Sequence, residues 1–126
     1  MPPITLLIVD DDDAGANALA AAVMAYGCRA LVAASGKAAF ETPASWVPHV
    51  VILDIEMPEW DGFSVAKAMR GSSRFATVPI VAHSSLPEAE VSERGIEAEI
   101  DAYYRKGEPL RGLFRTIEYL APVRYL

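Results

Sequence analysis

The stretch VVILDI at residues 50–55 is a nearly unbroken apolar run that carries an acid, Asp54, close to its end. A run of this kind, rich in branched side chains and without polar alternation, is typical of a β-strand buried on both faces of a sheet. Residues 4–9 (ITLLIV) and 79–82 (PIVA) have the same character. Such strands need helices on both sheet faces, so the sequence predicts a layered α/β fold.

The segments between the apolar runs have the periodicity of helices, and Gly27 and Gly71 stand where two of these helices would end. We expect weaker strands at 29–33 and 102–104, and helices at 14–26, 37–42, 63–70, 85–98 and 109–120. The repeated alternation of strand and helix predicts a flavodoxin-like (βα)5 doubly wound sandwich, with a five-stranded parallel sheet in the order 2-1-3-4-5.

The fourth of these helices is the least regular in sequence. The tetrapeptide Ser85-Leu86-Pro87-Glu88 has the form of a capping box, which predicts that the helix begins there. The helix contains few apolar residues and an internal glycine, Gly95, so we expect it to be the loosest of the set.

Composition limits the class of protein. The chain has 126 residues, of which 52% are hydrophobic, and a net charge of -6, which suit a single domain over 1–126 with a core at about 4–120. The negative charge argues against direct nucleic-acid or membrane binding. The lone cysteine, Cys28, excludes a disulfide framework and fits a cytoplasmic protein.

Charged and polar side chains stand at the carboxyl ends of the expected strands, where ligand sites form in open α/β sheets. Asp10 and Asp11 follow the first strand, Asp54 lies near the end of the third, Ser84 ends the fourth and Lys106 follows the fifth. Clustered carboxylates without histidine or cysteine favour Mg²⁺ over zinc. A divalent cation, a hydroxyl and an ammonium together suit phosphoryl transfer.

Five ordered motifs carry a resemblance to a known family. They are Ile8-Val9-Asp10-Asp11-Asp12, Val51-Ile52-Leu53-Asp54, Met57-Pro58-x-x-Asp61-Gly62, Pro79-Ile80-Val81-Ala82-x-Ser84 and Tyr103-x-x-Lys106. In this order and spacing they resemble the receiver domain of two-component response regulators, over about residues 4–120.

The resemblance implies a role for each matching residue at the expected site. Asp54 would be the phosphoacceptor, attacking a phosphohistidine to form an acyl phosphate. Asp11 and Asp54 would bind Mg²⁺ directly, with the backbone carbonyl of Glu56 as a third ligand and Asp10 supporting the ion through a water. Lys106 would grip a phosphoryl oxygen.

The resemblance also implies a switch built from Ser84 and Tyr103. Ser84 would move to grip a phosphoryl oxygen, and Tyr103 would turn inward into the space that it leaves. This movement would change the surface formed by residues 85–98, 102–104 and 109–120, and so control a downstream protein.

Three positions depart from the usual pattern of the family. Gly107 follows the lysine where receivers usually have proline, often after a cis bond, and a cis bond before a non-proline residue costs about 2.5–4 kcal/mol. We therefore expect a trans bond or a more mobile loop after Lys106. Ser84 replaces the commoner threonine, and Glu56 adds a negative side chain that we expect to influence the rate of phosphate loss.

Several other polar residues have structural explanations. Asp12 and Asp13 would cap the following helix, and Asp61 would begin the third helix. His49 would be structural, and His83 would be a packed or surface histidine. Tyr103 and Tyr104 alternate, so one faces each side of the sheet, and plain packing is the alternative to a switch role for Tyr103.

The implied partners are a histidine kinase or a histidine phosphotransfer protein, and a downstream protein target. The expected fourth helix carries an acidic series, whereas the last helix carries Arg111 and Arg115. Opposite charges on neighbouring helices suggest a homodimer through this face.

Three other functions compete with a phosphorylated receiver, which would act as a signalling domain and not as an enzyme. One is a receiver-like module that binds a partner without phosphorylation. Another is a flavodoxin-like electron carrier, although the aspartates after the first strand would repel an FMN phosphate. The third is a Mg²⁺-dependent phosphatase with an aspartate nucleophile, for which Asp54-Ile55-Glu56 offers only a glutamate as the second acid.

Overall fold

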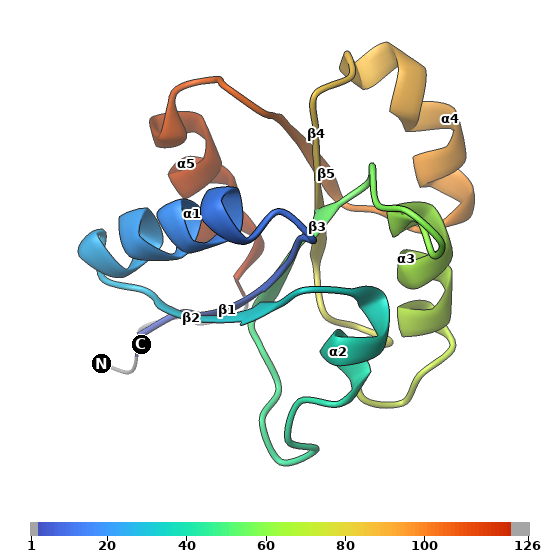
Figure 1. The fold of residues 1–126 in the computed structure, drawn as a ribbon, viewed down its shortest axis with the longest axis horizontal. Helices are drawn as coiled ribbons and strands as arrows, with labels where there is room; N and C mark the ends of the chain where they lie inside the picture. Colours follow the sequence, from blue (N-terminus) through green and yellow to red (C-terminus); the bar gives the residue numbers. More distant parts are fainter. Residues whose placement is uncertain (1–2, 122–126) are drawn as a thin grey trace.

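The computed structural model describes residues 3–121 and contains one parallel sheet (Figure 1). Its strands follow the order β2-β1-β3-β4-β5, which confirms the predicted topology. The strands are β1 (Thr5–Val9), β2 (Arg29–Ala33), β3 (Val50–Asp54), β4 (Ile80–Ser84) and β5 (Ala102–Arg105). All four adjacent pairs are parallel.

Between residues 3 and 121, five helices cover the two faces of the sheet (Figure 1). They are α1 (Asp13–Ala25), α2 (Gly36–Phe40), α3 (Gly62–Arg70), α4 (Glu88–Glu97) and α5 (Leu110–Leu120). Helices α1 and α5 lie on one face, and α2, α3 and α4 lie on the other. Within residues 3–121, no helix combines the length and apolar character that crossing a bilayer requires.

Alternate residues of the central strands feed two separate apolar cores. Leu7, Val51 and Leu53 belong to the core beneath α2, α3 and α4, whereas Ile8 and Ile52 belong to the core beneath α1 and α5. Every residue of β3 is buried, as its unbroken apolar run predicted. Because side chains alternate along a strand, Asp54 lies on the face of Ile52, toward α1 and α5.

The predicted caps of two helices are wrong. Helix α4 begins at Glu88 after Pro87, and within the described residues no side chain caps it. Ser85 of the expected capping box bonds to Glu56 instead. Asp12 occupies the position before α1, but its side chain accepts no hydrogen bond from that helix in the described structure. Asp61, in contrast, accepts a hydrogen bond from the backbone N–H of Ser64 and begins α3 as predicted.

Arg70, at the end of α3, ties together the loops at the amino-terminal edge of the sheet. Its guanidinium donates to the backbone carbonyls of Phe75, Val78 and Glu99, and it forms a 2.8 Å ion pair with Asp101. The Asp101 carboxylate in turn accepts from the backbone N–H of Ile80. This guanidinium therefore anchors the residues that follow α4 to the loop before β4.

Candidate functional site

Three carboxylates meet where β1 and β3 end. Asp10, Asp11 and Asp54 each offer an oxygen within 4.8 Å of the others. They converge because β1 and β3 are neighbours in the sheet, with Val9 in register with Leu53. Asp10 and Asp54 are buried and Asp11 is exposed, so the cluster opens to solvent on one side.

Among the described residues, Asp54 accepts hydrogen bonds through one of its carboxylate oxygens and not through the other. Its Oδ1 accepts from Lys106 Nζ at 3.1 Å and from the backbone N–H of Glu56 at 3.0 Å. Burial raises the pKa of Asp54 and the charge of Asp10 adds to the rise, although these two hydrogen bonds oppose it. The arrangement leaves Oδ2 without either donor.

Lys106 completes the group, which we call the acceptor cluster (Asp10, Asp11, Asp54 and Lys106). Its Nζ lies 4.0 Å from Asp10 in addition to its bond to Asp54. Burial alone would lower the pKa of Lys106, but the hydrogen bond and charge of Asp54 outweigh it and the pKa is raised. The ammonium therefore stays charged beside the acids at neutral pH.

The loop after Lys106 has a conformation that suits glycine. Gly107 has φ of +89°, which the ring of proline, fixed near −65°, cannot adopt. No peptide bond between described residues is cis, so the bond from Lys106 to Gly107 is trans. The backbone N–H of Lys106 donates to the carbonyl of Ser84 at 2.8 Å, which continues the pairing of β4 with β5 past the end of the strand.

A second group, which we call the hydroxyl cluster, consists of Glu56, Ser84 and Ser85. The Ser84 hydroxyl donates to Glu56 Oε1 at 2.7 Å, and the backbone N–H of Ser85 donates to the same oxygen at 2.7 Å. Ser85 Oγ lies 2.8 Å from both carboxylate oxygens. The hydrogen bonds from Ser84 and Ser85 lower the pKa of Glu56 to about 2, so this carboxylate is ionised.

Tyr103 lies on the other side of Ser84, against α4. Its ring packs on the core beneath α3 and α4, and its hydroxyl donates to the backbone carbonyl of Ser92 at 3.3 Å. A Cβ built on Gly95 would overlap the Tyr103 hydroxyl and lie 2.9 Å from Cζ. The glycine that predicted a loose helix is thus the notch in which Tyr103 sits.

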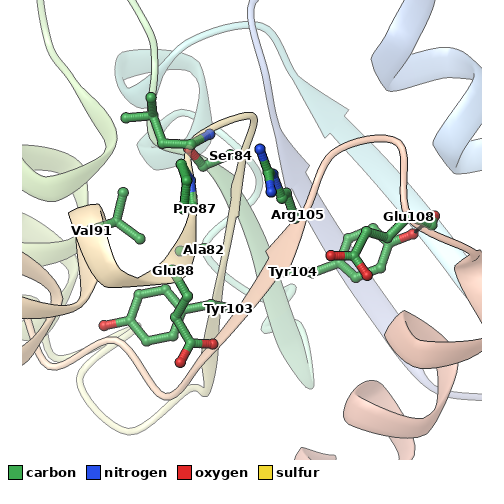
Figure 2. A pocket seen from close by; sticks show the side chains of 10 residues that line it. Ala82, Ser84, Pro87, Glu88, Val91, Tyr103, Tyr104, Arg105 and Glu108 are labelled. Carbon is green, nitrogen blue, oxygen red and sulfur yellow. Dashed lines mark hydrogen bonds between the residues drawn. The ribbon is translucent and has the colours of Figure 1, made fainter.

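A cavity of about 240 Å³ lies between Ser84 and Tyr103 (Figure 2). Its walls come from the ends of β4 and β5 and from the first turns of α4, with Val91 and Arg105 on opposite sides. Tyr104 points from β5 in the opposite direction to Tyr103, as the alternation predicted. The cavity gives side chains at this edge room to move.

A family model for the response regulator receiver domain matches residues 6–118. The chain belongs to the response regulator receiver family. Receiver domains of this family are signalling domains of two-component systems, and the acceptor cluster suits magnesium and phosphorylation. This confirms the resemblance found in the sequence motifs.

Relatives and solved structures agree with the family assignment. The receiver is 32% identical over 105 residues to a gliding motility regulatory protein of Myxococcus xanthus, covering 83% of this chain and 14% of that protein. The chemotaxis protein CheY4 of Vibrio cholerae shares the fold, with a TM-score of 0.88, 23% identity, and coverage of 94% of this chain and 99% of that one.

A further structural neighbour was solved with a magnesium ion in its active-site cleft. It is the receiver domain of the sensor histidine kinase PA1611 of Pseudomonas aeruginosa, with a TM-score of 0.84, 21% identity, and coverage of 94% of this chain and 98% of that one. The present chain spans between 14 and 50% of the length of the first curated relatives that it matches.

His83 is a feature of this receiver that the sequence pattern did not connect with the site. It lies beside Asp54 in the register of β3 with β4 and stacks on Tyr104, with ring centroids 5.3 Å apart. It lines a cavity of about 350 Å³ together with Asp10 and Lys106. Burial lowers the pKa of His83 to about 4, and the charge of Lys106 adds to this. His83 is therefore a neutral packing residue, as predicted, but on the acceptor side.

Three further residues remain to be compared with their predicted roles. His49 accepts a hydrogen bond from the backbone N–H of Thr5 at 2.9 Å, which agrees with a structural role. Ser84 reaches the site edge but bonds to Glu56 and not to a member of the acceptor cluster. Ser85 is the residue that sequence reasoning missed, because its position at the start of an expected capping box explained it in another way.

Proposed function

We propose that this receiver takes a phosphoryl group on Asp54 from the phosphohistidine of a histidine kinase or histidine phosphotransfer protein. The observation that carries the proposal is the geometry of the acceptor cluster. A buried carboxylate lies beside two others, and the Lys106 ammonium is 3.1 Å from one of its oxygens.

The proposed step is a transfer of phosphorus from nitrogen to oxygen. An Asp54 carboxylate oxygen attacks the phosphorus, the P–N bond to the donor imidazole breaks, and that nitrogen keeps the bonding pair and takes a proton from solvent. The product is a mixed anhydride on Asp54. Oδ2 suits the attack, since Oδ1 already accepts two hydrogen bonds. Lys106 would move its hydrogen bond to a phosphoryl oxygen.

The acceptor cluster fits a magnesium ion by its chemistry. Its three aspartates, two of them buried, offer carboxylate oxygens, and such hard ligands suit Mg²⁺. Asp11 and Asp54 would hold the ion with the Glu56 carbonyl, and Asp10 would support it through a water. When bound, the ion would neutralise the negative charge that gathers on the transferred group.

Intact mass spectrometry after incubation with acetyl phosphate and Mg²⁺ tests the proposal. Wild-type protein is expected to gain one labile phosphoryl group, and Asp54→Asn is expected to gain none because an amide oxygen is a poor nucleophile. Glu59→Gln, an exposed acid in the loop after β3, is the matched control and should be modified like wild type. An adduct on Asp54→Asn would place the acceptor elsewhere.

A receiver that is never phosphorylated is the competing function. It is supported by the engagement of Ser84 with Glu56 and by the glycine after Lys106. If wild type stays unmodified with acetyl phosphate, incubation with a phosphorylated histidine phosphotransfer protein decides the matter. Failure with both donors would favour a module that acts by binding alone.

The output that we propose is a change of surface on α4, β5 and α5 of this receiver. The changed surface would control a protein partner in the cytoplasm, without direct contact to nucleic acid. Tyr103 supports this proposal because it lines the cavity of Figure 2 together with Ser84 and its hydroxyl donates to the Ser92 carbonyl of α4. Phosphorylation would draw Ser84 toward the phosphoryl group and let Tyr103 turn inward.

The same surface would form a homodimer. Glu93 and Glu97 are exposed on α4, and Arg111 and Arg115 are exposed on α5. Pairing of these helices about a two-fold axis would bring opposite charges together. Sedimentation of the protein with and without beryllofluoride, a phosphoryl mimic, is expected to show a dimer that weakens with salt. A monomer under both conditions would remove this part of the proposal.

A further inference from the structure

The carboxylate of Glu56 is held in place although its side chain comes from an exposed residue. Three groups donate to it, and every donor comes from the end of β4 or the residue after it. An exposed glutamate usually samples many rotamers, so three bonds to one side chain fix a specific orientation. The orientation brings Oε1 onto the hydroxyl of Ser84.

Ser84 has no donor capacity left for another acceptor. Its single hydroxyl hydrogen points to Glu56, and its oxygen accepts from the backbone N–H of Leu86 at 3.0 Å. The side chain is buried, with 3% of its surface exposed, so water cannot easily replace either bond. A phosphoryl oxygen on Asp54 could receive this hydrogen only after Glu56 has lost it.

We propose that Glu56 is a positioning residue that holds the Ser84 hydroxyl in the resting orientation, and that Ser85 keeps Glu56 there. The proposal rests on the proposed function, because it concerns how a phosphoryl group on Asp54 recruits Ser84. The phosphoryl group and Glu56 compete for one hydrogen atom. The strength of the Glu56 bond therefore sets how readily the switch follows phosphorylation.

Simple charge repulsion between Glu56 and a phosphoryl group is the alternative explanation for any effect of this residue. Removing Glu56 abolishes both the hydrogen bond and the charge, so it cannot separate them. The variant Ser85→Ala can separate the two effects, since it removes a hydrogen bond that holds Glu56 and leaves the charge of Glu56 unchanged. A less firmly held Glu56 spends less time on Ser84, because its side chain regains rotamer freedom.

Binding of beryllofluoride in the presence of Mg²⁺, measured by calorimetry, tests the inference on the intact chain. Ser85→Ala is expected to bind about three- to fivefold more tightly than wild type, as loss of part of a charge-assisted contact implies. Glu56→Ala is expected to bind more tightly still. Ser73→Ala is the matched control and should equal wild type, because Ser73 is exposed in the loop between α3 and β4, at the opposite edge of the sheet from the site.

A second measurement uses neither metal nor mimic. The amide resonances of Ser85 and Leu86 in the ¹H–¹⁵N spectrum of the Mg²⁺-free protein should shift in Glu56→Ala, because one loses its acceptor and the other follows Ser84. Unshifted amides would overturn the resting contact. Ser85→Ala that binds beryllofluoride no more tightly than wild type would overturn the positioning role and leave only charge.

These outcomes separate the inference from the proposed function. Wild type that binds no beryllofluoride and gains no phosphoryl group from either donor contradicts the proposed function, while the amide shifts still decide the resting contact. Wild type that is phosphorylated on Asp54 but shows no difference from Ser85→Ala contradicts the inference alone.

Discussion

The acceptor cluster and the hydroxyl cluster lie at the same edge of the sheet. They differ in whether their side chains already make the contacts that phosphorylation would require. In the acceptor cluster, Lys106 already contacts Asp54, and three carboxylates already surround one point. In the hydroxyl cluster, Ser84 is bonded to Glu56. One group is assembled for its proposed task, whereas the other is occupied by a different partner.

The difference follows from what holds each group. The acceptor residues are positioned by buried strand ends and by backbone hydrogen bonds, which have one arrangement. Glu56, Ser84 and Tyr103 are held by side-chain contacts next to a cavity, and such contacts can be exchanged for others. The comparison teaches that chemistry and switching can be assigned to separate groups of residues at one edge of the sheet.

The largest expected effect tests the rigidity of the acceptor side. A Cβ on Gly62 would overlap the backbone carbonyl of Asp54 and lie 2.6 Å from the Cα of Ile55. Backbone cannot move aside as a side chain can, so Gly62→Ala should reduce the free energy of unfolding by about 3 kcal/mol. Urea denaturation measures this. Gly112→Ala, where a Cβ meets nothing within 4 Å, should instead stabilise α5 by about 0.5–1 kcal/mol.

The next effect is a pH dependence on the acceptor side. The pKa of His83 is about 4, below its ordinary value of 6.5, so the unfolded chain binds the proton more readily. Stability is then complete above pH 6.5 and falls as the pH drops from 6.5 to 4, by about 2–3 kcal/mol after allowance for partial exposure. Denaturation of wild type and His83→Phe at each pH checks the slope.

The titration of two carboxylates, Glu56 and Asp54, must be distinguished from that of His83 between pH 6.5 and 4. The pKa of Glu56, lowered to about 2, removes stability only as the pH falls from about 4.5 to 2, below the His83 window. The raised pKa of Asp54 acts in the opposite direction, because its protonation favours the folded state. A wild-type slope between pH 6.5 and 4 that persists unchanged in His83→Phe would contradict the assignment.

A smaller effect on stability is expected when Mg²⁺ binds the acceptor cluster. Mg²⁺ at ten times its dissociation constant should raise the free energy of unfolding by about 1.4 kcal/mol, since it binds the folded state alone. Thermal melts with and without Mg²⁺ measure the gain. Asp11→Asn removes one exposed carboxylate of the cluster and should lose most of it. An equal gain in the variant would mean that the ion binds elsewhere.

The smallest effect on stability, within about 1 kcal/mol, is expected on the switch side. Gly95→Ala would place a methyl group on the Tyr103 hydroxyl, but this is the movable end of a side chain and alanine favours the helix. Tyr103 should leave its notch, and its ring resonances should shift by NMR while the unfolding free energy changes little. Loss of stability as large as that of Gly62→Ala would contradict the contrast between the two sides.

Much of the fold and the acceptor cluster could be predicted from sequence, because the charged residues stand at the ends of apolar runs that are recognisable as strands. Asp10, Asp54 and Lys106 each adjoin an apolar run, and parallel strands bring such ends together. The hydroxyl cluster could not be predicted, since the rotamer of Glu56 depends on donors 28 and 29 residues away. From the sequence, Gly95 predicted only a loose fourth helix. Its contact with Tyr103 could not be predicted, because sequence does not show which aromatic ring approaches a glycine.

The bonds of Arg70 anchor one end of α4 and leave the other end without such an anchor. Its guanidinium fixes the carbonyl of Glu99, just after the helix, and through Asp101 the start of β5. The opposite end of α4 adjoins the cavity of Figure 2. The carboxyl end of α4 is therefore its anchored end, and we expect any movement of this helix to be largest at the turn around Glu88. A displacement at Ser84 would therefore move the turn around Glu88, which a partner protein can contact, and leave the carboxyl end of α4 in place.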